Sequence, residues 1–189
     1  GIYGKSLSIG EIALSEKITG YLGASRLFSS TYEIAQSYID RIGLMPFHVN
    51  THPAGKVLLM KLLDELDASH APILWALVIS LSVCLIVPLS YKVARLLSFS
   101  KNHSALVGTS VSIMPSLALF CPGFDAYNAF LCTLLLLLWI KGLLRSRSKG
   151  SLTLYAFSIG IIGYSAVTFS YTSLVFGSVL IAWSPWIVG

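Results

Sequence analysis

The stretch from His48 to Lys56, HVNTHPAGK in one-letter code, combines residue types that bind metals or phosphates. Two histidines four positions apart share one face of a helix and can hold a metal ion there. Pro53, however, disfavours the α conformation at His52, so we expect no regular helix through both histidines. A nucleotide-phosphate loop needs a glycine five positions before its Gly-Lys pair and Ser or Thr after it. This chain has Asn50 and Val57 at those places, which excludes such a loop.

The same stretch has the residues that begin a helix. Pro53 suits the first helical position, where its missing N–H costs nothing, and His52 or Thr51 would then be the capping residue. The free N–H groups and the dipole of a helix start attract anions. Gly55 would let another group approach the backbone closely, and Lys56 adds a positive charge. Two interpretations remain open, an ordinary helix start and a phosphate-recognition corner.

Long runs of residues without charge follow this stretch, and they predict the helices of the rest of the chain. Only 11% of the 189 residues are charged and 55% are hydrophobic, whereas a soluble domain carries about 25% charged residues. About 20 apolar residues cross a bilayer as a helix. The run from 151 to 189 carries no charge, is too long for one helix and is expected to form two, broken near Phe169–Ser173. The predicted spans are 71–91, 104–124, 126–144, 151–169 and 172–189, which together form a bundle over residues 71–189. The sequence therefore predicts an all-α integral membrane protein with about five transmembrane helices.

Positive charge predicts the orientation of these helices. Residues 92–103 carry three basic groups, residues 141–149 carry four, and neither loop has an acid. Short basic loops stay on the cytoplasmic side. Residues 1–70, with six basic and seven acidic groups, are then extracytoplasmic, as are Asp125 and Tyr171. The basic excess belongs to the two loops, which removes the case for nucleic-acid binding and predicts a multi-pass protein of the plasma or inner membrane.

Residues 1–70 are expected to form a loop region with amphipathic, juxtamembrane helices. Ser30 and Glu33 fit a capping box, in which each side chain accepts a hydrogen bond from the other residue's N–H, before a helix that Gly43 stops. A second helix is expected from Pro53. Its apolar stripe consists of Leu58, Leu59, Leu62, Leu63 and Leu66, and its polar side of Lys56, Lys61, Asp64, Glu65 and Asp67. Such helices lie on a membrane surface or against the bundle, and a packed loop domain is the alternative.

The two ends of the chain predict a fragment of a longer protein. The sequence starts with Gly1 and ends inside the apolar segment Trp186–Gly189. A signal peptide would need a basic start and a continuous apolar stretch, and neither is present. We therefore expect truncation at both ends and a further span before Gly1.

The segment FHVNTHPAGKVLL resembles the HxxTHPPGPxLL segment of polytopic glycosyltransferases of the GT-C class, which include protein O-mannosyltransferases and the aminoarabinose transferase. The resemblance covers residues 20–175. Its other parts are the helix Tyr32–Ile42, the segments Met114–Phe120 and Pro122–Asp125, similar to the family's PSLLLFxPxxD, and Phe169–Thr172. Ala54 and Lys56 depart from the family pattern, because both replace prolines.

The resemblance implies transfer of a sugar from a polyprenyl-phosphate-linked donor to an acceptor on the extracytoplasmic face. The partners would be membrane lipid and this donor, with no tightly bound cofactor and no motif that supports a divalent metal. The substrate-binding candidates are His52, Pro53, Gly55, Lys56, Arg41, Asp125 and Tyr171. The family's catalytic acid lies in the first extracytoplasmic loop, expected upstream of Gly1, and Glu11, Glu16 and Asp125 are weaker candidates. Asp125 can equally be a solvated turn residue and Tyr171 an interfacial anchor.

Two other classes of protein remain open. A multi-span transporter or flippase usually places ionisable groups within its spans, and the uncharged runs of this chain hold none. A non-catalytic membrane subunit is the other alternative, and its sequence would have no distinguishing feature.

Overall fold

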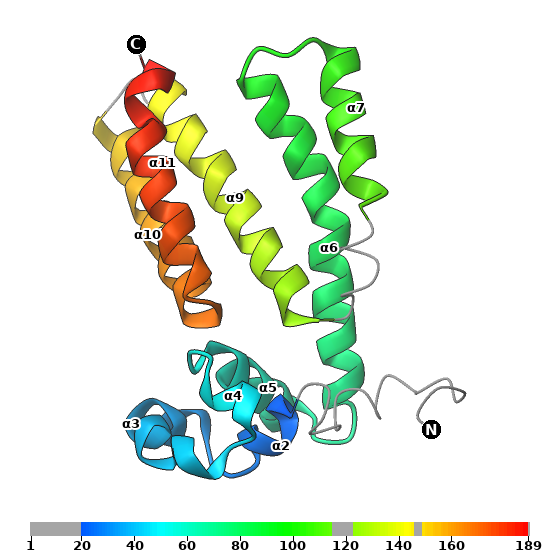
Figure 1. The fold of residues 1–189 in the computed structure, drawn as a ribbon, viewed down its shortest axis with the longest axis vertical. Helices are drawn as coiled ribbons and strands as arrows, with labels where there is room; N and C mark the ends of the chain where they lie inside the picture. The colour runs from blue at the N-terminus through cyan, green and yellow to red at the C-terminus, as the bar shows by residue number, and fades with distance from the viewer. Residues whose placement is uncertain (1–19, 115–122, 146–148, 189) are drawn as a thin grey trace. The chain divides into compact units, whose positions relative to one another are not determined.

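The computed structural model describes residues 20–114, 123–145 and 149–188 (Figure 1). It divides into two compact units, Gly1–Val78 and Ile79–Gly189. All regular structure in the described residues is helical, as predicted. Three helices among them are long and apolar enough to cross a membrane, namely Ala71–Leu96, Phe124–Leu144 and Gly150–Phe169.

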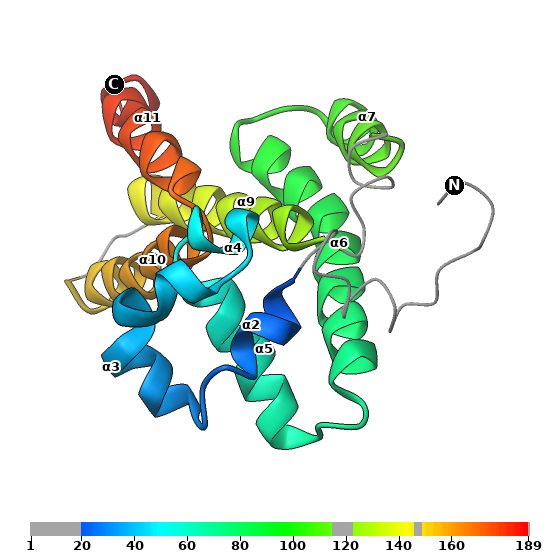
Figure 2. The same ribbon diagram turned by 60° about the horizontal axis from the view of Figure 1, so that its bottom comes forward.

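The first unit consists of short helices around a small apolar core. Its helices are α2 (Tyr21–Ser25), α3 (Thr31–Arg41), the 3-10 turn η1 (Ile42–Leu44), α4 (Phe47–Asn50), α5 (Gly55–Leu66) and the first turns of α6 (Ala71–Leu96). Both α2 and α3 pack against α5, and Figure 2 shows α2 beside α5. The fully buried side chains include Leu22, Phe28, Ile34, Val49, Val57 and Met60. The two predicted helices are therefore present as α3 and α5, and the short α4 was not predicted.

The start of α3 confirms half of the predicted capping box. The Ser30 hydroxyl accepts a hydrogen bond from the Glu33 N–H at 3.2 Å. The other half of the prediction, a hydrogen bond from the Ser30 N–H to the Glu33 carboxylate, was wrong. Ser29 binds this carboxylate instead, with two donors. The Ser29 N–H and hydroxyl both donate to one Glu33 oxygen, at 2.5 and 2.7 Å.

The second unit holds the remainder of α6 together with α7 (Lys101–Ser112), α9 (Phe124–Arg145), α10 (Lys149–Phe169) and α11 (Thr172–Val188). The predicted spans 71–91, 126–144 and 151–169 coincide with α6, α9 and α10. The predicted break near Phe169–Ser173 is confirmed, since α10 ends at Phe169 and α11 begins at Thr172. The predicted span 104–124 is described only as α7, because residues 115–122 lie outside the described residues. At 17 residues α11 is an apolar helix of less than spanning length.

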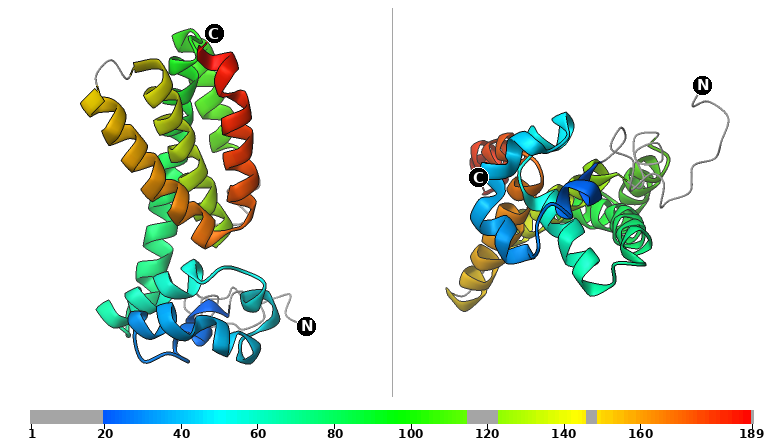
Figure 3. Two further views of the ribbon diagram at one scale, coloured as in Figure 1. Left: turned by 90° about the vertical axis from the view of Figure 1, so that its left-hand side faces the viewer. Right: turned by 90° about the horizontal axis from the view of Figure 1, so that it is seen from below.

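Helix α9 holds the second unit together. It packs against α10 and α11 (Figure 3). The residues Val93, Leu137 and Ile140 form an apolar cluster that joins the C-terminal end of α6 to that of α9. The two predicted basic loops begin at these ends. Figure 1 accordingly places the α6–α7 connection at the same end of the unit as the end of α9, with the α10–α11 turn at the other end.

Candidate functional site

The chain around His52 forms a turn between two helices. Helix α4 ends at Asn50, so no helix runs through His48 and His52, as predicted. Helix α5 begins at Gly55, with Ala54 at its N-cap position and no side chain capping it. The predicted start at Pro53, with His52 or Thr51 as the cap, was therefore wrong by two residues. The residue before a proline avoids the α region, and the chain bends there before α5 starts.

Tyr38 of α3 holds this turn in place. Its hydroxyl lies 3.1 Å from the His52 carbonyl oxygen and 3.4 Å from that of Val49, and it donates its single proton to this pair of acceptors. The ring of Tyr38 is buried and stacks on Phe28, with ring centroids 6.4 Å apart and an interplanar angle of 18°. Tyr38 thus fixes the backbone of His52 from a different helix. The sequence placed Tyr38 on an apolar helix face and gave no sign of this bond.

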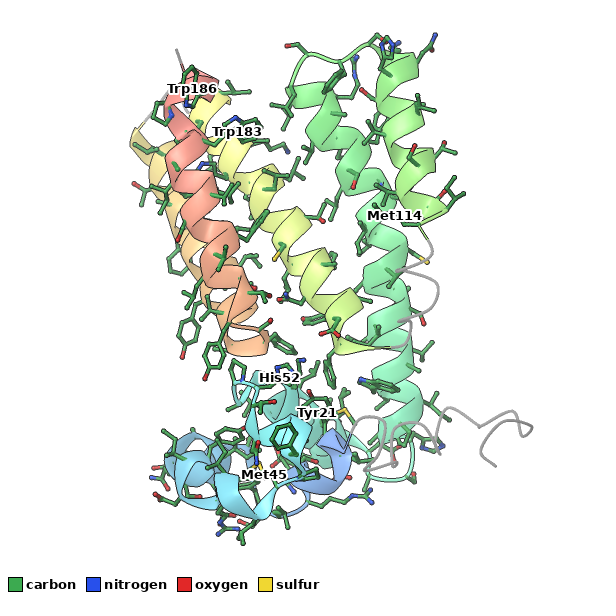
Figure 4. All side chains as sticks on the ribbon, in the orientation of Figure 1. Tyr21, Met45, His52, Met114, Trp183 and Trp186 are labelled. Atoms are coloured by element: carbon green, nitrogen blue, oxygen red, sulfur yellow. The ribbon has the colours of Figure 1, made fainter. Side chains whose placement is uncertain are left out.

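Lys56, in the first turn of α5, lies inside the unit against an aromatic ring. Its side chain is 2% exposed, and its Nζ lies 5.3 Å from the centroid of the Tyr21 ring. An ammonium over an aromatic face gains a cation–π attraction, which grows as water is excluded. The Tyr21 ring also lies 6.4 Å from the His52 ring, at 47° (Figure 4). Tyr21 therefore joins the two predicted residues His52 and Lys56. Tyr21 could not be found from the sequence, since it lies far from the motif along the chain, before both of the predicted amphipathic helices.

Arg41 is engaged by protein groups of its own unit. Its guanidinium donates to the Glu33 carboxylate and to the Leu27 carbonyl. It also lies over the Phe28 ring, 5.2 Å from the centroid. Arg41 is thus linked to the His52 turn through Phe28 and Tyr38, and its contacts are those of a residue that stabilises the fold.

Asp125 and Tyr171 lie at one end of the second unit. Asp125 is exposed in the first turn of α9, where the helix dipole favours a negative charge. Tyr171 is exposed in the short turn between α10 and α11. The ring of Phe169 lies 6.0 Å from Phe124 and 4.9 Å from Tyr127, which brings this turn to the start of α9. The two predicted residues are therefore gathered at the same end.

The remaining predictions concern metals and the acidic candidates. Within residues 20–114, 123–145 and 149–188, no group of three or more His, Cys, Asp or Glu side chains is placed to hold a metal ion. Glu11 and Glu16 fall outside the described residues.

Comparison of the chain with known protein families, curated proteins and solved structures found no match. The described residues fold as helices, three of which are long and apolar enough to cross a membrane, and the candidate site is the turn at His52, where Tyr21 contacts His52 and Lys56.

Proposed function

We propose that this protein is a GT-C type glycosyltransferase of the plasma or inner membrane. It transfers a sugar from a polyprenyl-phosphate-linked donor to an acceptor on the extracytoplasmic face. One observation supports the proposal above all: a buried lysine, Lys56, stands in the first turn of α5 with Tyr21, and Tyr21 also contacts His52. His52 and Lys56 belong to the segment FHVNTHPAGKVLL, which resembles the family.

The chemistry needs positive charge where the lipid phosphate departs. As the bond from the sugar to the phosphate breaks, negative charge grows on the phosphate oxygens. A fixed ammonium with little water around it stabilises that charge more than one in bulk water would. Lys56 supplies the ammonium, the His52 ring can donate a hydrogen bond, and Tyr38 holds the His52 backbone in place.

The acceptor hydroxyl must lose a proton during transfer, which calls for a carboxylate as general base. Glu11, Glu16 and Asp125 are the candidates that this chain carries. Asp125 is the one among the described residues, and it is exposed at the end of a candidate span.

The proposed topology has five spans: the three candidate spans α6, α9 and α10, then α11, and a fifth that would begin in α7. The Ser173 hydroxyl donates to the Asn128 side chain at 3.1 Å, and the Trp139 ring N–H donates to Ser184 at 2.9 Å. The two residues of α9 are 11 positions apart, and so are their partners on α11. The later residue of α9 bonds the later residue of α11, so the two helices run parallel. The distance between the two hydrogen bonds is about 16 Å at a rise of about 1.5 Å per residue. This distance is about half of the roughly 30 Å hydrocarbon core, and this contact with α9 supports the proposal that α11 enters the bilayer beside it.

A matched pair of lysine variants tests the proposed role of Lys56. Lys56→Met keeps the length of the side chain and removes its charge. The control is Lys61→Met, which removes a second buried lysine from the same helix, 3.9 Å from Asp64. We expect Lys56→Met to lower transfer from a panel of radiolabelled polyprenyl-phosphate hexoses by about 10²–10³-fold, and Lys61→Met to retain most of it. Equal activity of Lys56→Met, His52→Ala and Asp125→Asn with the wild type would rule out this site.

Cysteine labelling tests the proposed face. Thr51 is exposed at the turn and Asn102 is exposed at the start of α7. With the native cysteines replaced by serine, Thr51→Cys should react with an impermeant maleimide from the extracytoplasmic side, and Asn102→Cys only from the cytoplasm. Labelling of Thr51→Cys from the cytoplasm alone would place the site on the wrong face for this reaction.

A further inference from the structure

Helix α5 buries both of its lysines and exposes three of its five leucines. Lys56 and Lys61 are 2% and 8% exposed, whereas Leu58, Leu62 and Leu66 are 40%, 47% and 70% exposed. In a helix on the surface of a soluble domain this distribution is reversed, since the apolar face lies toward the core. The orientation of α5 within its unit therefore requires an apolar environment outside the unit.

The three exposed leucines form one stripe. They are spaced four residues apart, and side chains at that spacing stack on the same helix face. The face against α2 and α3 carries Val57, Met60 and Leu63 instead. The charges of α5 on the protein side are paired there: Asp64 lies 2.9 Å from Arg26 and 3.9 Å from Lys61. Glu65 is exposed and lies seven residues after Leu58, so it stands beside the stripe on the helix surface. Its carboxylate accepts hydrogen bonds from the Thr31 N–H and hydroxyl, at 2.7 and 3.3 Å. The stripe thus has one carboxylate at its edge, and Thr31 binds that carboxylate.

We propose that Leu58, Leu62 and Leu66 rest in the bilayer interface, so that α5 lies along the surface of the membrane that α6 crosses. The reason for lipid as the occupant is the connection to α6. Helix α5 ends at Leu66 and α6 begins at Ala71, and five residue steps reach at most about 18 Å. The first unit itself extends to Val78 and so contains the first turns of this candidate span. A leucine stripe held this close to the start of a span meets lipid before any free partner. This inference is independent of the proposed enzymatic activity.

Site-directed spin labelling of the full chain in vesicles of phosphatidylcholine and phosphatidylglycerol tests the proposal. Nitroxides are attached at Leu62→Cys and, separately, at Leu66→Cys, with the native cysteines replaced by serine. The control is Gln36→Cys, at an exposed polar residue of α3 in the same unit. Oxygen concentrates in hydrocarbon and a neutral nickel chelate stays in water, so the ratio of their collision rates with the nitroxide reports its environment.

We expect this ratio to be several-fold higher at positions 62 and 66 than at position 36. Equal ratios at the three positions would mean that the stripe faces water, and would overturn the proposal. Low collision rates with both reagents at positions 62 and 66 would mean that protein covers the stripe, either another part of this chain or a second copy of it. This outcome would also overturn the proposal. Two label positions are used so that a variant that fails to fold leaves the other to decide.

Discussion

The two units differ in how they use polar side chains. In the first unit these side chains join different helices: Arg26 of the α2–α3 connection pairs with Asp64 of α5, and the Thr31 N–H donates to Glu65 at 2.7 Å. In the second unit many hydroxyls bond a carbonyl of their own helix, as Ser158 and Ser178 do, four residues back. Helices in lipid must satisfy their polar groups internally. The first unit thus uses charged side chains to join its helices, whereas the apolar helices of the second unit satisfy many of their hydroxyls within a single helix.

The largest expected effect comes from removing the ring of Phe28, which is buried between Tyr38 and Arg41. Phe28→Ala should cost about 3–5 kcal/mol, a large part of the roughly 5–15 kcal/mol that stabilises a typical domain. We expect the first unit to lose its fold while the helices of the second remain. Limited trypsin digestion in detergent should then cut at Arg26 and Lys61 much faster than in the wild type.

The neighbouring residue provides the control. Leu27 is apolar and exposed, so Leu27→Ala should change stability by no more than about 0.5 kcal/mol. Equal protection of Phe28→Ala and the wild type would show that the first unit has no core of its own. Simultaneous digestion of both units would show that they unfold together.

The helices of the second unit were largely predictable because the lengths of its uncharged runs identify them. A run of about 20 uncharged residues has one stable arrangement in lipid, and α6, α9 and α10 coincide with three predicted runs. The break at Ser170–Tyr171 was found for the same reason, since the uncharged run from 151 to 189 exceeds a single span. The pairing of α9 with α11 through Trp139 and Ser184 was not predictable, because it depends on which faces meet.

The first unit was predictable in its helices but not in its contacts. The spacing of apolar residues in α5 identified a leucine stripe and a side with lysines. This spacing does not show which of the two sides packs against the rest of the unit. Tyr21 and Tyr38 both reach the His52 turn from separate helices earlier in the chain, α2 and α3. No local pattern contains such contacts, which is why the candidate site was incomplete in the sequence.

A smaller effect should follow from crowding two candidate spans of the second unit. A Cβ added at Gly142 of α9 would lie 3.4 Å from the Tyr155 Cβ and 3.7 Å from the Ile159 Cδ1 of α10. Gly142→Leu should therefore force these helices apart and cost about 1–3 kcal/mol. Gly160→Leu is the matched control, because no atom lies within 4 Å of a Cβ there. Unfolding in mixed dodecyl sulfate and maltoside micelles measures both. If the two variants unfold alike, the contact of α9 with α10 at Gly142 is absent from the folded protein.

The smallest expected effect is a loss of stability at low pH, which should affect the first unit and not the second. The pKa of Glu33 lies below its ordinary value of 4.5, chiefly because the Ser29 hydroxyl and then the Ser29 N–H donate to its carboxylate. The pKa of Asp67 falls from 3.8 to about 2, chiefly through hydrogen bonds from Ser69 and His70. A carboxyl whose pKa is lowered by folding contributes stability that is complete above its unfolded pKa and is lost as the pH falls through the folded value. The second unit has one carboxyl side chain, Asp125.

Between pH 4.5 and about 2, amides of the first unit should therefore lose protection from hydrogen exchange, while those of α9 and α10 keep it. Peptic peptides analysed by mass spectrometry report both units in one experiment, after correction for the intrinsic pH dependence of exchange. The double variant Glu33→Gln/Asp67→Asn removes both titrations, so its first unit should be less stable at neutral pH and depend less on acid. Loss of protection in both units at the same pH would mean that their stabilities are coupled, and that the polar contacts of the first unit do not set its own stability.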